Sequence, residues 1–161
     1  MNDSAPVELP RSGRLVGIDF GTVRIGVAIT DPDQKFASPY ENYQRTTAAA
    51  EEKFFQRLAK EERVCGFVVG LPVHLDGNSS HISEMALEFG KWLGQLTGLP
   101  VAWFDERFTT STAEELIRDA NLTSKKRKAL KDKLAAQILL TAFLESPRDE
   151  RRSIRGLDDR N

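Results

Sequence analysis

The chain has 161 residues, of which 40% are hydrophobic and 29% charged. This size suits one domain with a single core, and the composition excludes a collagen-like, low-complexity or acidic disordered chain. No apolar run reaches the roughly 18 residues of a membrane span, and the polar start of the chain does not look like a secretory signal. Cys65 is the only cysteine, which excludes an internal disulfide and a thiolate zinc site. We therefore expect a cytoplasmic protein with no membrane association.

The charges nearly balance, with 23 basic against 24 acidic side chains and a net charge of −1. A domain that adheres to nucleic acid over its whole surface usually has a pI above about 9, so such adhesion is not expected. Basic residues are nonetheless concentrated between Lys125 and Lys133, where Asp132 is the only acid. This segment is either a local contact surface for nucleic acid or a solvated helix face.

Three strands are expected at the start of the domain. Arg14–Phe20 is apolar on both sides, which is typical of a central strand covered on both faces. Arg24–Thr30 follows after a short connection containing Gly21, as in a hairpin. Phe36–Arg45 is a weaker third strand, and Pro39 within it favours an edge position.

Helices and strands then alternate, as judged from the spacing of apolar residues and from stop signals. We expect a helix at Thr47–Arg63, a strand at Val64–Leu71, a loop at Pro72–Asn78, a helix at Ser80–Thr97, a strand at Val101–Phe104, a helix at Ser111–Ala120, and a last helix that starts between Ser124 and Ala129 and ends at Glu145. The helix at Ser111 would open with a capping box formed by Ser111 and Glu114.

This order of elements predicts an α/β domain. Antiparallel hairpins come first and strand–helix–strand units follow, whose right-handed crossovers make the later strands parallel. The result is a mixed sheet of about five strands with helices on both faces. We expect the domain to span residues 14–145, with flexible tails at residues 1–13 and 146–161.

Asp19 is the first candidate site residue, because it lies near the C-terminal end of the strand expected to be central. Aspartate is depleted in strands, and a buried carboxylate needs a partner, a ligand or a proton. The alternative is that Asp19 caps the turn at Gly21. We therefore treat Asp19 as a candidate ligand or catalytic acid.

Glu106 follows the strand Val101–Phe104 within the sequence Asp105-Glu106-Arg107. Ligands of open α/β sheets bind beyond the carboxyl ends of the strands, where Asp19 is also expected. Either acid of this segment could serve, and the sequence leaves the choice between Asp105 and Glu106 open. Ordinary acids at a helix start are the alternative.

Asp132 is the third candidate. On the predicted last helix it shares a face with Ala135, Ala136 and Leu139, so we expect it to point along the apolar stripe. The alternative is a solvated charge paired with neighbouring lysines. Three converging carboxylates would suit Mg²⁺ or Mn²⁺, and two such ions can activate water and stabilise the leaving oxygen of a phosphodiester.

Four segments of the chain together resemble the bacterial YqgF family, also called RuvX. They are GIDFGTVRIGVAITD at 17–31, VVGLPVHLDGN at 68–78, FDERFTTSTAEELI at 104–117 and KDKLAAQILLTAFLE at 131–145. The resemblance implies the RNase H-like fold of Holliday-junction resolvases, with sheet order third, second, first, fourth, fifth. Members of the family are regarded as nucleases that mature the 5′ end of pre-16S rRNA.

The resemblance also implies roles for individual residues. Asp19, Glu106 and Asp132 would be the catalytic residues and would bind Mg²⁺ or Mn²⁺. Many RNase H-like nucleases carry their second acid at the end of the fourth strand, where this chain has Gly70-Leu71-Pro72, so Glu106 must reach inward. Contacts to nucleic acid are expected from Arg24, Arg107, Thr109, Thr110, Lys125, Lys126, Arg127 and Lys128, although ion pairs, caps or solvation explain these residues as well.

The expected function is therefore metal-dependent endonucleolytic cleavage of structured RNA, with pre-16S rRNA as the substrate. One alternative is a Holliday-junction resolvase, which would act on branched DNA as a symmetric dimer. Another is an RNA-binding assembly module without turnover. We expect a monomer or a weak homodimer.

Overall fold

A computed structural model describes residues 8–72, 81–118 and 121–146. Its elements are β1 (Arg14–Asp19), β2 (Arg24–Thr30), β3 (Ala37–Gln44), α1 (Ala48–Glu61), β4 (Val64–Leu71), α2 (His81–Thr97), β5 (Val101–Asp105), the 3-10 turn η1 (Glu106–Thr109), α3 (Thr110–Ile117), α4 (Ser124–Lys133) and α5 (Ala135–Glu145). None of the described helices has the length and apolarity that a bilayer span requires.

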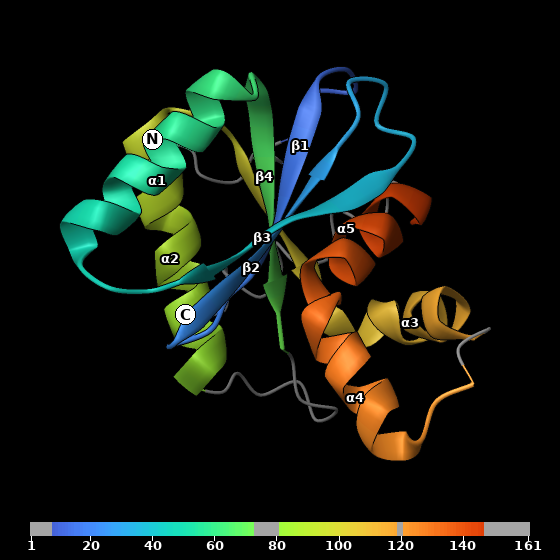
Figure 1. The fold of residues 1–161 in the computed structure, drawn as a ribbon. Coiled ribbons are helices and arrows are strands. Elements are labelled where there is room, and N and C mark those ends of the chain that lie inside the picture. The colour runs from blue at the N-terminus through green and yellow to red at the C-terminus, as the bar shows by residue number, and fades with distance from the viewer. Residues whose placement is uncertain (1–7, 73–80, 119–120, 147–161) are drawn as a thin grey trace.

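The five strands form one mixed sheet in the order β3-β2-β1-β4-β5, which confirms the predicted topology (Figure 1). β1 is antiparallel to β2 and parallel to β4, and β5 is parallel to β4. Because β1, β4 and β5 run in the same direction, their carboxyl ends share one edge of the sheet. Asp19 at the end of β1 and Glu106 directly after β5 are therefore placed at the same edge.

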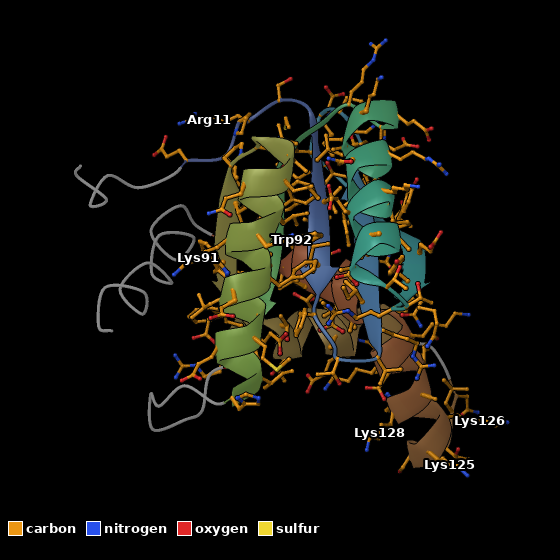
Figure 2. The ribbon with its side chains drawn as sticks, turned by 90° about the vertical axis from the view of Figure 1, so that its left-hand side faces the viewer. Arg11, Lys91, Trp92, Lys125, Lys126 and Lys128 are labelled. Atoms are coloured by element: carbon orange, nitrogen blue, oxygen red, sulfur yellow. The ribbon has the colours of Figure 1, made fainter. Side chains whose placement is uncertain are left out.

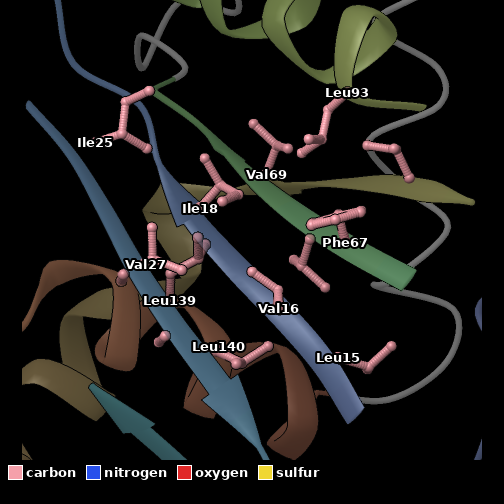
Figure 3. Packing of buried hydrophobic residues seen from close by; sticks show 14 of the residues in the cluster. Leu15, Val16, Ile18, Ile25, Val27, Phe67, Val69, Leu93, Leu139 and Leu140 are labelled. Carbon is pink, nitrogen blue, oxygen red and sulfur yellow. The ribbon is translucent and has the colours of Figure 1, made fainter. Parts of the chain in front are cut away.

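Helices cover both faces of this sheet. α1 and α2 lie on one face, and α5 lies on the other with α3 and α4 beside it (Figure 1). Leu93 of α2 packs near Val69 of β4, while Leu139 and Leu140 of α5 close the opposite side of the core (Figure 3). β1 is buried from both directions, which explains why its sequence lacks the alternation of a half-exposed strand.

Gly17 allows α5 to approach β1 closely. A Cβ atom at this position would lie 2.9 Å from Leu140 Cβ and 3.2 Å from the carbonyl oxygen of Ala136. Real Cβ atoms do not approach other atoms that closely, so only glycine permits this helix–strand distance. The start of α5 is thereby held against the strand that ends at Asp19.

β3 is an edge strand, as its proline predicted. It pairs only with β2 and is mostly exposed. Ala28 of β2 lies opposite Pro39, and the register shifts between Val27 and Ala28. Proline cannot donate to a ladder and is tolerated at edges and bulges, which accounts for both features.

The capping box predicted at Ser111 is wrong. α3 begins one residue earlier, at Thr110, and follows directly on η1, so Ser111 lies inside the helix. The side chain that caps this region is Asp105, whose carboxylate accepts a 2.8 Å hydrogen bond from the backbone N–H of Arg107. The end predicted for this helix, at Ala120, lies outside the described residues.

The single last helix predicted from the sequence is interrupted. Leu134, with φ −99° and ψ 9°, separates α4 from α5. Its flanking hydrogen bonds persist, from Leu134 N to Leu130 O and from Ile138 N to Leu134 O. The apolar stripe therefore begins in α5, whereas α4 has no buried residue.

The described residues 8–13 of the N-terminal segment contact the domain. Gly13 N donates to Pro32 O at 2.7 Å, and the side-chain amide of Gln34 donates to Pro10 O at 2.8 Å. Leu9 packs against the core. Residues 1–7, residues 73–80, where most of the predicted loop falls, and residues 147–161 of the predicted C-terminal tail lie outside the described part of the chain.

Candidate active site

Asp19 ends β1 with its side chain on the α5 side of the sheet, because alternate side chains of a strand share a face and Gly17 faces α5. Its partner on β2 is Gly26. A Cβ atom at Gly26 would lie 3.4 Å from both Asp19 Cβ and Ala136 Cβ. Glycine therefore leaves space for the Asp19 carboxylate between β2 and the start of α5.

Glu106 reaches inward from the end of β5 toward β1. It is the first residue of η1, directly after the strand. A Cβ atom at Gly70 of β4, the strand between β5 and β1, would lie only 2.8 Å from Glu106 Oε1. The carboxylate therefore lies over Gly70, in the space that a larger residue would fill.

Asp132 lies in the last turn of α4 and is exposed. The expectation that it points along the apolar stripe of the last helix is wrong, because the break at Leu134 separates α4 from the buried stripe of α5. Its charge is nonetheless close enough to Asp19 to raise the pKa of that residue. The break thus leaves Asp132 solvated at the same edge as the two more buried acids.

Burial and nearby carboxylates raise the pKa values of the two inner acids, Asp19 and Glu106. The pKa of Asp19 rises to about 6, first because burial disfavours the charge and second because of the Asp132 carboxylate. The pKa of Glu106 rises to about 7, through burial and then through the charges of Asp19 and Asp105. Asp19 is therefore electrostatically linked to both Glu106 and Asp132.

Asp105 has a structural role that leaves its carboxylate occupied. It is 2% exposed, caps the backbone N–H of Arg107, and forms a bidentate pair with the Arg107 guanidinium at 2.8 Å and 2.5 Å. This pair also raises the pKa of Arg107. Of the two neighbouring acids, Glu106 is the one directed toward Asp19.

The three acids approach one another without forming a closed metal cage. Within residues 8–72, 81–118 and 121–146, no three His, Cys, Asp or Glu side chains stand close enough to make a ready-made metal site. The donor set consists of carboxylate oxygens, which suit hard cations such as Mg²⁺ and Mn²⁺ that retain several waters. The pKa values of Asp19 and Glu106 are raised by burial and by neighbouring carboxylates, and a bound divalent cation would lower both.

Some of the other residues predicted to contact nucleic acid have side chains bound to groups of the protein, and others have exposed side chains. Arg107 is held by Asp105, and the Thr109 hydroxyl donates to Glu106 O at 2.7 Å. Thr110 is exposed at the start of α3. The Arg24 side chain is exposed at the start of β2 and has no hydrogen bond or ion pair with any residue that the structure describes. Arg24 is thus free of the ion pairs with Asp19 or Asp31 that its sequence position allowed.

The cluster Lys125, Lys126, Arg127 and Lys128 occupies the exposed first turns of α4. Figure 2 shows Lys125, Lys126 and Lys128 at the outer end of this helix, directed away from the sheet. Asp132 lies seven positions after Lys125, which corresponds to about 10 Å along a helix. Cationic side chains therefore extend from the acidic edge outward into solvent.

Sequence reasoning missed the role of Gly70. It treated the end of β4 as a place where an acid is absent, whereas the missing side chain is what admits Glu106. A glycine inside a strand often marks a close approach by another group, and that signal was available in the sequence. Which group approaches could not be read from it, because Glu106 lies 36 positions further along the chain.

Comparison with known proteins identifies the family of this chain. A family model described as "RuvX: Holliday junction resolvase" matches residues 13–146. The chain belongs to the RuvX family. It is 50% identical over 139 residues to a Rhodopirellula baltica protein named "Putative pre-16S rRNA nuclease", covering 86% of this chain and 80% of that relative. A Rhodopseudomonas palustris protein of the same name is 36% identical and covers 88% of both chains.

A solved structure supports the fold assignment of this RuvX-family chain. RuvC of T. thermophilus, solved in complex with a Holliday junction substrate, has a TM-score of 0.51 and 13% identity, covering 81% of this chain and 94% of that chain. Together with the observed sheet order, this likeness confirms the RNase H-like fold predicted from the sequence.

Proposed function

We propose that this RuvX-family chain is a metal-dependent endonuclease that hydrolyses phosphodiester bonds in structured RNA, with the 5′ end of pre-16S rRNA as its substrate. The observation that supports the proposal is that Glu106 reaches over Gly70 toward the end of β1, with Asp19 close enough to raise the pKa of Glu106 and Asp132 close enough to raise that of Asp19. The names of the relatives support the reaction and the substrate.

The chemistry follows from the charges at this edge. Asp19, Glu106 and Asp132 would supply oxygen ligands to Mg²⁺ or Mn²⁺, and such ions, when bound, activate water and stabilise charge on the leaving oxygen. Without a cation, the same acids repel one another and also repel a phosphate backbone. Divalent cations therefore convert an edge that excludes nucleic acid into one that attracts it.

Basic side chains near this edge would hold the rest of the substrate. We assign the backbone contacts to Arg24 and to the α4 cluster at 125–128, whose side chains are exposed. Contacts of this kind position a nucleic acid without reading its sequence. Recognition of the precursor would then depend on its shape.

The decisive experiment is single-turnover cleavage of a pre-16S 5′ fragment with Mg²⁺ or Mn²⁺. We expect the wild-type chain to cleave and Asp19→Asn to lose at least about a hundredfold in rate, because the central carboxylate would no longer carry charge. Asp33→Asn, which changes an exposed acid in the loop before β3, is the matched control and keeps full activity. Equal cleavage by wild type and Asp19→Asn would refute the assignment.

A Holliday-junction resolvase is the second candidate, favoured by the description of the family model and by the RuvC likeness. The same three acids would then act on branched DNA. Preferential cleavage of a four-way junction over the RNA fragment, under identical conditions, would favour this candidate. A binding module without turnover is the third, and full complementation of a deletion strain by Asp19→Asn would favour it.

A further inference from the structure

Arg45, the residue after β3, joins three segments of the fold. Its Nη1 donates to Gly21 O at 3.1 Å, and its backbone N–H donates to Val23 O at 3.0 Å. Its Nε and Nη2 pair with the two carboxylate oxygens of Glu51 in α1 at 2.8 Å and 2.9 Å. One side chain therefore connects the β1–β2 turn to the end of β3 and to α1.

This connection is more buried than an ordinary surface ion pair. Glu51 is 7% exposed, and the Arg45 side chain is 26% exposed. The guanidinium also lies 5.0 Å from the centroid of the Phe20 ring, which packs in turn on Phe89 at 5.2 Å. A charge with this degree of burial, held by a bidentate partner and an aromatic face, has little freedom to move.

The turn that Arg45 holds is the one that follows Asp19. Phe20 and Gly21 are the next two residues, and a Cβ atom at Gly21 would collide with the carbonyl oxygen of Arg24. Alternate residues face opposite sides of the sheet, so Asp19 lies on the α5 side and Phe20 on the side of α1 and α2. Arg45 thus binds the β1–β2 turn on the sheet face that carries α1 and α2, opposite the face on which Asp19 lies.

We propose that Arg45 is a positioning residue, which fixes the end of β1 so that the Asp19 carboxylate is held at the distance from Glu106 and Asp132 that catalysis needs. This inference rests on the proposed nuclease function. Arg45 acts through the backbone of residues 20–23 and touches neither substrate nor cation. Small displacements of a reacting group can cost about a hundredfold in rate. The contact between Arg45 and the turn can therefore affect the cleavage rate from a distance.

The test compares Arg45→Ala, Arg45→Lys and the control Arg57→Ala in the full-length chain. Arg57 forms an exposed ion pair with Glu61 in the same helix as Glu51, at 4.0 Å, and has no part in the turn. Single-turnover rates and substrate affinity are measured well below the melting temperature of each variant. Amide hydrogen exchange of residues 20–23 provides a readout without any cation or substrate.

We expect Arg45→Ala to lower the cleavage rate by about tenfold or more with little change in substrate affinity, and to raise the Mn²⁺ concentration needed for half-maximal rate. Exchange at residues 20–23 increases in the same variant. Arg45→Lys recovers part of the cleavage rate. An ammonium group can reach Gly21 O or Glu51, but it cannot form the paired hydrogen bonds of the guanidinium to both carboxylate oxygens of Glu51. Arg57→Ala resembles wild type in every measurement.

If Arg45 has only a structural role, Arg45→Ala has a lower melting temperature and an unchanged cleavage rate. That result overturns the proposal. If Arg45→Ala does not fold, Glu51→Gln replaces it. This variant weakens the paired hydrogen bonds between Arg45 and Glu51 and keeps a neutral acceptor. Unchanged exchange at residues 20–23 in Glu51→Gln would then contradict the inference. Failure of the proposed function is distinct, because it appears as equal cleavage by wild type and Asp19→Asn.

Discussion

At the scale of single residues, the site stores unfavourable charge. Burial raises the pKa values of both Glu106 and Asp19, and the neighbouring carboxylates of Asp19 and Asp132 respectively raise them further. Asp105 shows the opposite solution, since it is nearly inaccessible but satisfied by Arg107 and by a backbone N–H. Adjacent acids in one sequence triplet therefore differ in role because their partners differ.

The stability of the cation-free protein should fall as the pH rises from about 4.5 to about 7. The pKa of Glu106 rises from 4.5 to about 7 on folding, so within this window the folded state binds more protons than the unfolded state. Its stabilisation is present at low pH and is lost as the pH passes the folded value. The same sign holds for Asp19, whose pKa rises from 3.8 to about 6.

Glu106→Gln tests this prediction directly. Removing the ionisable group should stabilise the cation-free protein at pH 8 by up to about 3 kcal/mol and should abolish cleavage. Thermal unfolding in the presence of a chelator measures the change, with the exposed Glu114→Gln of α3 as control. A lower melting temperature for Glu106→Gln than for Glu114→Gln would contradict the electrostatic account.

Gly70→Ala should separate activity from stability. The added Cβ atom would meet Glu106 Oε1 at 2.8 Å and the Leu139 methyl groups at 3.2 Å. A carboxylate on a flexible side chain moves at low cost, so we expect a loss of stability of only about 1 kcal/mol and a loss of cleavage rate of at least about tenfold. Gly94→Ala in α2 is the control, and retention of full activity by Gly70→Ala would show that Glu106 need not occupy this space.

At the scale of elements, α4 contacts only its neighbours α3 and α5 to any extent among the described elements. It has no buried residue, and its cap is the Thr123 hydroxyl, which accepts from Lys126 N at 3.3 Å. A helix that contributes no side chain to the core can be dense in cations without loss of packing. Its sequence is therefore free to serve a partner rather than the fold.

Neutralising α4 should weaken nucleic-acid binding without unfolding the protein. For the triple change Lys125→Gln, Lys126→Gln and Lys128→Gln, we expect weaker RNA binding and a salt dependence reduced by roughly one unit of slope for each lost phosphate contact. Binding titrations across a range of salt concentrations measure both effects. The control is Lys53→Gln with Lys60→Gln on α1, which lies on the other face of the sheet (Figure 1). If both variants lose the same RNA affinity, binding depends on the overall charge of the protein and not on a defined surface at α4.

At the scale of the whole molecule, the oligomeric state separates the two nuclease hypotheses. Resolution of a four-way junction needs two symmetric cuts, whereas one cut at the 5′ end of an rRNA precursor does not require a dimer. We expect sedimentation to give a monomer or a weak homodimer, with the RNA fragment cleaved under conditions in which the protein is monomeric. A tight dimer that cuts junctions in matched pairs would favour the resolvase.

The sequence by itself determined the fold class, the strand order and the three candidate acids. Apolar runs, alternation and glycine or proline punctuation depend on neighbours along the chain, so they are visible without coordinates, and the four family-like segments added the topology. The strand containing Asp19 is such a case, because its apolar character on both faces already indicated a central position.

Only the tertiary structure showed that Asp105 is paired with Arg107 while Glu106 lies over Gly70, located the break at Leu134 and showed what Arg45 contacts. Each of these features depends on groups that are distant in sequence and meet only when the sheet closes. Asp105 is occupied because Arg107 folds back onto it, and Glu106 has room because β4 carries no side chain beneath it. Packing in three dimensions therefore determines that the Asp105 carboxylate has a cationic partner, while the Glu106 carboxylate lies next to other acids.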